Sequence, residues 1–343
     1  MKRIFSGRDG EIWRHTAGGM LAAVLWSTTV AAGRRLTEAF GGMSTVALVH
    51  AAAAVFSLLY LAVSPAARQS VIRGSKRYLV GCGALFILYV LLFYRVLALA
   101  SSREQVLVVG IINYLWPSLS LLLSVPLLGR RTSLPALLGA NLLAVLGVAL
   151  ALLAGSDITA RGYTAVIAGG WQAYLPAFGA ALCWGLYNNL SRRWGGADGS
   201  GAVPVFIIVT ALLMSPRLYQ IHGDISFEPE SVSLLAFVAL FPTFLAYFLW
   251  DQAERKGHHS TVNAMAYGIP VASTLITSLY LHLKVPALTW LGCVMVIAGA
   301  ALSRLVILDR DPDIKDKEII GLRNILRINL GHLSGLTGKR SRP

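Results

Sequence analysis

Ten long apolar stretches with few or no charges constrain the fold of this chain more than any other feature. They lie near 16–33, 43–63, 78–100, 105–125, 134–154, 172–190, 202–220, 232–250, 261–282 and 287–307. A helix needs about 20 apolar residues to cross a bilayer. Charged residues make up 13% of the chain, against about 25% in soluble domains. The sequence therefore predicts an all-α polytopic membrane protein with ten transmembrane helices.

Basic residues gather on alternate connections between these expected spans. With a cytoplasmic N-terminus, 23 of the 30 Lys and Arg residues fall on the inner side of the membrane and six on the outer side. Because cytoplasmic loops are enriched in Lys and Arg, the pattern predicts that both termini are cytoplasmic. It also accounts for the net charge of +14 without a nucleic-acid partner. An alternative is that 16–33 forms the core of a signal peptide.

The two halves of the chain resemble each other. A shift of 158 positions places Trp26 on Trp184, and a shift of 153 positions places Pro117 on Pro270. Five helices in each half would give the halves opposite orientations in the membrane, as in many alternating-access carriers. Chance matching remains the alternative, because Leu, Ala and Gly are abundant in both halves. The predicted organisation is a cytoplasmic N-terminus at 1–13, inverted five-helix repeats at 14–155 and 171–308, and a basic tail at 309–343.

The tail has apolar residues at helical spacing among basic ones, which is the pattern of a helix lying on the membrane surface. A disordered basic tail fits the same residues.

Proline lies near the middle of two expected spans. Pro117 follows Asn113 and Tyr114, and Pro270 follows Tyr267. A proline inside a helix removes a backbone hydrogen bond and kinks it, so both positions are predicted hinges with backbone acceptors available nearby. The alternative is that the kinks serve helix packing only.

Aromatic residues with polar edges also lie well inside the spans, where their N–H and O–H groups need interior partners. Trp and Tyr more often anchor spans at the membrane interfaces, and this alternative fits Trp171 and Tyr78, and can account for Trp250 and Trp290. It fits Trp26, Trp116 and Trp184 less well.

Ionisable groups are scarce in the spans. His50 is the one central ionisable residue, Asp251 lies at a span end, and His258 and His259 are interpreted as solvated loop residues. No metal-ligand spacing, phosphate loop or catalytic triad is present, so we expect no metal, no cofactor and no enzyme activity. The lack of a central carboxylate indicates facilitated diffusion rather than ion coupling.

The chain resembles the drug/metabolite transporter superfamily with its paired EamA-type repeats. Within it, four segments are similar to bacterial inner-membrane exporters of aromatic amino acids and methyl viologen, over about 14–307: Leu25-Trp26-Ser27-Thr28, Asn113 to Leu119, Trp184, and Tyr247 to Trp250. Ser101-Ser102-Arg103-Glu104 departs from the His-containing turn expected there, which leaves the substrate range open.

This resemblance implies a carrier of the bacterial inner membrane that exports aromatic and other neutral amino acids by alternating access. A multidrug or quaternary-ammonium exporter, using the same aromatic rings for cation–π contacts, is the alternative. Expected partners are the amino acid and membrane lipid, with the protein a monomer or weak homodimer. The predicted substrate-binding residues are Trp26, Ser27, His50, Tyr89, Asn113, Tyr114, Trp116, Trp184, Tyr187, Tyr247, Trp250 and Tyr267.

Overall fold

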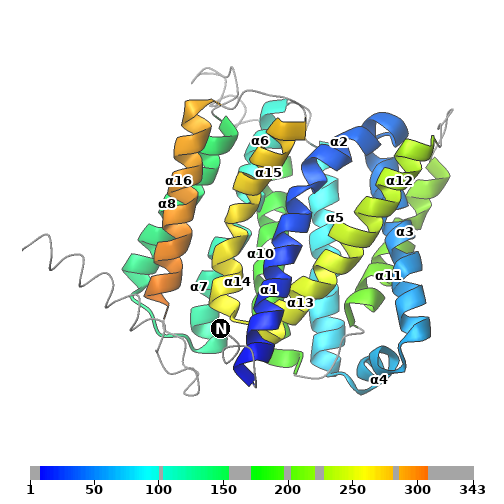
Figure 1. Cartoon of the computed structure of the whole chain (residues 1–343), viewed down its shortest axis with the longest axis horizontal. Helices are drawn as coiled ribbons and strands as arrows, with labels where there is room; N and C mark the ends of the chain where they lie inside the picture. The colour runs from blue at the N-terminus through cyan, green and yellow to red at the C-terminus, as the bar shows by residue number, and fades with distance from the viewer. Residues whose placement is uncertain are drawn as a thin grey trace, which may run out of the picture.

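The computed structural model describes residues 8–99, 103–153, 171–196, 202–220, 228–280 and 286–307. Helices occupy nearly all of these ranges and stand side by side in one bundle (Figure 1). Six helical segments are long and apolar enough to cross a membrane, and a seventh is obtained if Pro65–Arg73 and Arg77–Phe93, bent by 99°, form one span. An all-helical fold with several membrane-spanning helices is thus confirmed for the described residues. The total of ten spans stays a prediction, and the tail at 309–343 lies outside the described residues.

The first half of the chain contains α1 (Arg8–Ser27), α2 (Thr29–Phe40), α3 (Gly42–Val63), α4 (Pro65–Arg73), the π-helical segment η1 (Arg77–Cys82), α5 (Gly83–Leu99), α6 (Arg103–Asn113), α7 (Trp116–Leu128) and α8 (Leu134–Leu153). The second half contains α10 (Trp171–Trp194), α11 (Ala202–Met214), η2 (Ser215–Gln220), α12 (Pro229–Val238), the π-helical segment η3 (Ala239–Leu245), α13 (Ala246–Lys256), α14 (His259–Ala266), α15 (Gly268–Tyr280) and α16 (Ala287–Val306).

Two of the expected spans are broken near their middle. Pro117 is the second residue of α7, just after the break between α6 and α7, and Pro270 is the third residue of α15, just after the break between α14 and α15. A proline fits the first turn of a helix, where no backbone N–H is needed, but not its interior. The breaks therefore lie where the prolines predicted kinks, while the use of these breaks as hinges stays a prediction.

The eighth expected span is longer than predicted. Helix α12, η3 and α13 follow one another without a turn from Pro229 to Lys256, whereas the apolar stretch ends near residue 250. Five of the last six residues, all but Ala253, are polar or charged, and the six stay helical. The loop expected from Glu254 to His259 is in fact only Gly257 and His258.

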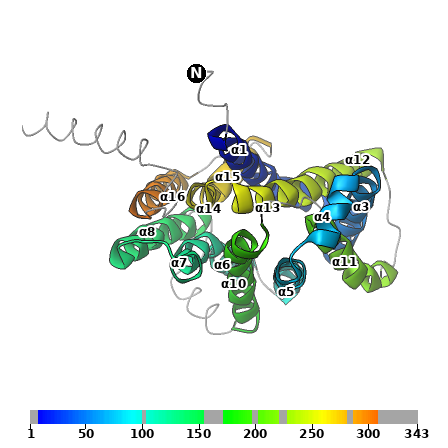
Figure 2. The ribbon, with the colours of Figure 1, turned by 90° about the horizontal axis from the view of Figure 1, so that it is seen from below.

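Helices from the two halves pack against each other in pairs. Helix α1 packs along α13, α10 along α5, α3 along α11, and α8 along α16 (Figure 2). The largest buried core draws its side chains mainly from α5, α10, α11 and α13, with smaller contributions from α1, η1, α7 and α14. Its large buried aromatic residues other than tyrosine are Phe86, Trp116, Trp184, Phe206 and Trp250.

The contact between α8 and α16 depends on glycine. A Cβ atom on Gly147 would lie 2.7 Å from the carbonyl oxygen of Gly292, and one on Gly299 would lie 2.6 Å from the backbone nitrogen of Ala144. Such distances leave no room for a side chain, so the two backbones are in direct contact. Small residues allow this close approach where helices pack within a membrane.

Candidate functional site

Aromatic side chains from five helices meet around Trp184, in the middle of α10. We call this group the Trp184 cluster; it comprises Trp26, Phe86, Tyr89, Trp116, Trp184, Tyr187, Tyr247 and Trp250. The ring of Trp184 stacks on Tyr187 with centroids 5.0 Å apart and approaches Tyr89 at 4.6 Å. Trp116 meets it edge-on at 6.4 Å. Every member except Phe86 is a predicted substrate-binding residue.

The indole N–H groups of two cluster members have partners inside the protein. Nε1 of Trp26 donates to the backbone oxygen of Pro242 at 2.9 Å, within the π-helical segment η3. Nε1 of Trp250 donates to Oδ1 of Asn188 at 3.0 Å. Since Trp250 is fully buried, it does not have the position of an interfacial anchor.

Ser27 and Asn113 lie beside the helix breaks. The hydroxyl of Ser27 is 2.8 Å from the backbone oxygen of Ala23 and 3.3 Å from that of Ile269, near the start of α15. Asn113 is buried at the end of α6, and its Oδ1 has no hydrogen-bond partner among the described residues. Tyr114, at the break itself, packs against both the main core and a second core next to α8. Asn113 therefore offers a buried acceptor for a donor from outside the protein.

Two predicted site residues lie apart from the Trp184 cluster. His50 is buried on α3, and its Nδ1 is 2.9 Å from the backbone oxygen of Val46 in the same helix. The hydroxyl of Tyr267 donates to Oδ1 of Asn141 at 2.6 Å and is hydrogen-bonded to Ser118. Tyr267 thus connects α7 and α8 to the α14–α15 break.

Sequence reasoning missed a group of buried charged residues at one end of the bundle. We call this end, where α1 begins and α10 and α13 end, the α1 end; it is the lower end in Figure 1. Asp251 and Glu254 are 2% and 0% exposed, and His259 is 1% exposed. The interpretation of His259 as a solvated loop residue is therefore wrong. Helix α13 continues past the apolar stretch and carries Asp251 and Glu254 into the protein interior, where His259 begins α14.

Asp251 and Arg255 form an ion pair that joins three elements. Nε of Arg255 is 2.9 Å from Oδ2 of Asp251, and the hydroxyls of Tyr78 and Tyr187 donate to Oδ1 at 2.7 and 2.8 Å. Nη1 of Arg255 lies 3.2 Å from the backbone oxygen of Gly195. Because these groups come from α13, η1 and α10, they hold the three elements together at the α1 end.

A second network surrounds Glu254. Its Oε2 is hydrogen-bonded to Nδ1 of His259, and its Oε1 accepts from Nδ2 of Asn263 at 2.7 Å. Nδ2 of Asn188 lies 2.8 Å from Oγ of Ser120 and 3.3 Å from Oδ1 of Asn263. Helices α7, α10, α13 and α14 are thus linked through polar side chains. The spacing of Asp251, Glu254 and Arg255 along one helix was the signal available in the sequence, since buried charges pair at such spacings.

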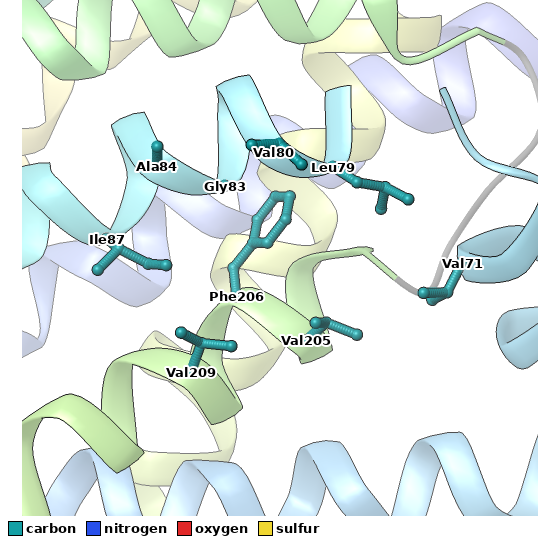
Figure 3. Close-up of a pocket in the computed structure, with 9 residues that line it drawn as sticks. All are labelled: Val71, Leu79, Val80, Gly83, Ala84, Ile87, Val205, Phe206 and Val209. Carbon is teal, nitrogen blue, oxygen red and sulfur yellow. The ribbon is translucent and has the colours of Figure 1, made fainter. Parts of the chain in front are cut away.

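An apolar groove of about 350 Å³ lies between η1, α5 and α11 (Figure 3). Its lining residues are Val71, Leu79, Val80, Gly83, Ala84, Ile87, Val205, Phe206 and Val209. None of these side chains offers a polar atom, so the groove suits hydrocarbon and not a zwitterion. In the described part of the chain, no three His, Cys, Asp or Glu side chains are grouped to hold a metal.

Comparison with known proteins gives consistent results. The sequence model of the EamA-like transporter family matches residues 16–153 and 171–305. The aromatic amino acid exporter YddG of Salmonella typhimurium is 28% identical over 292 residues, which cover 83% of this chain and 94% of that protein. The protein of the same name from Escherichia coli is 27% identical over the same shares of both chains.

Two further comparisons agree. The exporter YddG of Ancylobacter novellus is 29% identical over 66% of this chain and 75% of its own. One solved crystal structure superposes with a TM-score of 0.68 at 25% identity, covering 84% of this chain and 96% of the other. The matched family consists of transporters and not enzymes. The chain therefore belongs to the EamA-like transporter family and is a multi-pass membrane protein.

Proposed function

We propose that this protein exports aromatic and other neutral amino acids across the bacterial inner membrane by alternating access. The observation that carries the proposal is the Trp184 cluster, in which rings from α1, α5, α7, α10 and α13 meet in the protein interior. Flat aromatic faces attract a flat aromatic side chain. The names of the YddG relatives support this substrate class.

The groups beside the cluster suit the other end of an amino acid. The unpartnered Oδ1 of Asn113 can accept a hydrogen bond from an ammonium group, and the hydroxyl of Ser27 can donate to a carboxylate. Both residues lie next to helix breaks, where substrate can reach backbone groups. The cluster rings contact one another in this structure, so binding requires these helices to separate.

Reciprocal packing supports the two inverted repeats at 14–155 and 171–308. In that arrangement α1 corresponds to α10 and α5 to α12–α13, so the contact of α1 with α13 matches that of α10 with α5. The breaks at Tyr114 and Tyr267 correspond in the same way. The family match to two separate segments agrees with this division. Ten spans follow if α10, α11 and the broken α14–α15 are added to the seven apolar segments.

The α1 end is assigned to the cytoplasm. Arg73, Lys76 and Arg77 belong to the connection between α4 and η1, and Arg131 and Arg193 lie just after or at the ends of α7 and α10. Cationic residues at one end of a membrane bundle indicate its cytoplasmic side.

Downhill movement of the amino acid is the proposed driving force. The expectation of facilitated diffusion depended on the lack of a carboxylate near the centre of a span, and Asp251 and Glu254 are buried carboxylates that bear on it. Both carboxylates, however, lie at the α1 end and have partners of their own, Arg255 and His259. They therefore do not form a mid-membrane site that an ion could reach from either side in turn.

The test is efflux from liposomes containing the purified protein, with phenylalanine, tryptophan, threonine or a viologen inside. Trp184→Phe keeps an aromatic ring but removes ring area, and we expect it to raise the KM for tryptophan about fivefold, corresponding to about 1 kcal/mol of ring contact. Trp290→Phe is the matched control, because Trp290 is 45% exposed. Saturable efflux of the viologen but of no amino acid would instead support the cation exporter.

A further inference from the structure

The most deeply buried ionisable pair has no part in substrate binding under the proposed function. The side chains of Glu254 on α13 and His259 on α14 are both 0% exposed and are hydrogen-bonded through Oε2 and Nδ1. Asn263 donates from Nδ2 to Oε1 of Glu254 at 2.7 Å. The other ring nitrogen of His259, Nε2, is buried and has no hydrogen-bond partner in the part of the chain that is described.

The number of protons in this pair determines its charge. One proton must lie between Nδ1 and Oε2, because a bare imidazole nitrogen and a carboxylate oxygen are both acceptors. With that proton on His259, the pair carries one negative charge. A second proton makes the pair neutral overall. A buried net charge is costly. The pair therefore binds the second proton more tightly when it is shielded from water than when water reaches it.

Charged groups around the pair act in both directions. Arg192 on α10 and Arg130 before α8 place positive charge near the pair, and Asp251 places negative charge near it. Nη1 of Arg192 donates to the backbone oxygens of Glu254 and Gly257, at 3.1 and 2.8 Å, rather than to the carboxylate. Asp251 is paired with Arg255. The charges around the pair are therefore partly compensated, whereas both side chains of the pair are fully buried.

Further charged and titratable groups belong to the other elements packed against α13 and α14. From α16, Nε of Arg304 donates to Oγ1 of Thr261 at 2.8 Å, two residues along the chain from His259. From η1 and α10, the hydroxyls of Tyr78 and Tyr187 are bonded to Asp251. From α1, His15 lies near Lys256 and its Nε2 is 3.9 Å from Glu11. His258 is half-buried and its backbone N–H donates to Thr16.

The pair is connected to the Trp184 cluster by hydrogen bonds. Trp250 donates to Asn188 at 3.0 Å, and Asn188 donates to Asn263 at 3.3 Å. Asn263 in turn donates to Glu254. A change in the pair at the α1 end can thus reach the aromatic rings through three side-chain contacts.

We propose that Glu254 and His259 form a proton-binding site that controls opening of the α1 end. The closed form, seen here, binds one more proton than the open form, in which water reaches the pair. By linkage, protons on this side favour closure, and a higher pH favours opening. The assignment of this side to the cytoplasm rests on the proposed function. Because the proton enters and leaves from the same side, it regulates transport without driving it.

Cys82 provides a natural reporter of opening. Its thiol is buried in η1, within the core that also contains Tyr78 and Ala253 of α13. In a background with Cys183→Ala and Cys293→Ala, we would measure the maleimide reaction rate of Cys82 from about pH 6 to about pH 8. We would divide the rate of the folded protein by the rate of the unfolded chain at the same pH, which removes the effect of the thiol's own ionisation on the reaction. This readout needs no substrate, so it stands even if phenylalanine is not transported.

We expect the normalised rate to rise with pH, by up to about tenfold per pH unit, which is the slope for one proton. Glu254→Gln keeps the hydrogen bonds but cannot gain a proton, so its rate should be low and flat. Glu254→Leu, which also cannot gain a proton, is the second variant should Glu254→Gln not fold, and its rate should likewise not rise with pH. Glu11→Gln is the matched control, since it alters an exposed Glu–His pair at the same end, and it should behave as the wild type.

Three results would overturn the proposal. A flat normalised rate in the folded wild type means that opening binds or releases no proton. A slope that persists in both Glu254 variants assigns the proton to another group. Protons that cross the membrane in a fixed ratio to phenylalanine, with this coupling lost in Glu254→Gln, would be the third such result. The site would then be reached by protons from both sides of the membrane and would drive transport.

Discussion

Loss of the Asp251 carboxylate should destabilise this protein more than loss of its partner Arg255. Asp251→Asn keeps the shape of the side chain but removes the negative charge that accepts the 2.9 Å hydrogen bond from Nε of Arg255. The Arg255 side chain is 1% exposed, so its charge would lie in the interior without a counter-charge. Removing one partner of a buried ion pair costs about 3–5 kcal/mol.

Arg255→Met should cost less, because the hydroxyls of Tyr78 and Tyr187 continue to donate to the Asp251 carboxylate. The double variant removes both charges and retains the tyrosine contacts. We therefore expect its loss of stability to be smaller than the sum of the two single losses by about 2 kcal/mol, within the range measured for residues in direct contact.

The assay is the free energy of unfolding, measured by titrating the detergent-solubilised protein with a denaturing detergent. Glu11→Gln, which removes an exposed carboxylate 3.9 Å from His15, is the control and should change the free energy little. The expectation is wrong if the loss of stability in the double variant equals the sum of the two single losses to within about 0.5 kcal/mol, because additive losses mean that the two groups do not interact.

Further predictions concern other parts of the bundle. Gly292→Ala should lower the free energy of unfolding by about 1–3 kcal/mol, since its Cβ would lie 2.6 Å from the Ala151 nitrogen. Gly139→Ala, whose Cβ would have no atom within 4 Å, is the control, and equal effects of the two variants would contradict this prediction. Tyr267→Phe removes the hydrogen bond to Asn141 and should cost about 1–2 kcal/mol while leaving the KM for phenylalanine unchanged; a raised KM would place Tyr267 in the substrate site. Pro117→Ala and Pro270→Ala should slow efflux, because the helix breaks are the predicted hinges, whereas Pro126→Ala, on the exposed side of α7, should not. Unchanged efflux rates in Pro117→Ala and Pro270→Ala would mean that the breaks serve packing only.

Several features could be predicted from the sequence because each depends on local pattern. Apolar length predicted the spans, and Pro117 and Pro270 predicted the two breaks. The aromatic residues could be recognised because a Trp such as Trp184 in mid-span needs an interior partner. These features depend on residues close together in the chain.

The polar networks could not be predicted in this way, because their partners are distant in sequence. Asp251 is satisfied by Tyr78, 173 positions away, and neither residue alone indicates the contact. The segment 251–256 is polar and therefore resembled a loop after an apolar span. Tertiary packing keeps it helical and buried, which is the reason that Glu254 and His259 escaped notice.

The glycine contact between α8 and α16 has a practical consequence for spectroscopy. Because the backbones are in contact at Gly147, Gly292 and Gly299, neither helix can slide or rotate against the other without a steric clash. Spin labels or fluorophores attached to the outward-facing Leu142 and Ile297, which are 59% exposed each, would therefore form a fixed internal frame. Distances measured from that frame to a third label on α1, α5, α10 or α13 would separate movement of those helices from tumbling or compression of the whole molecule.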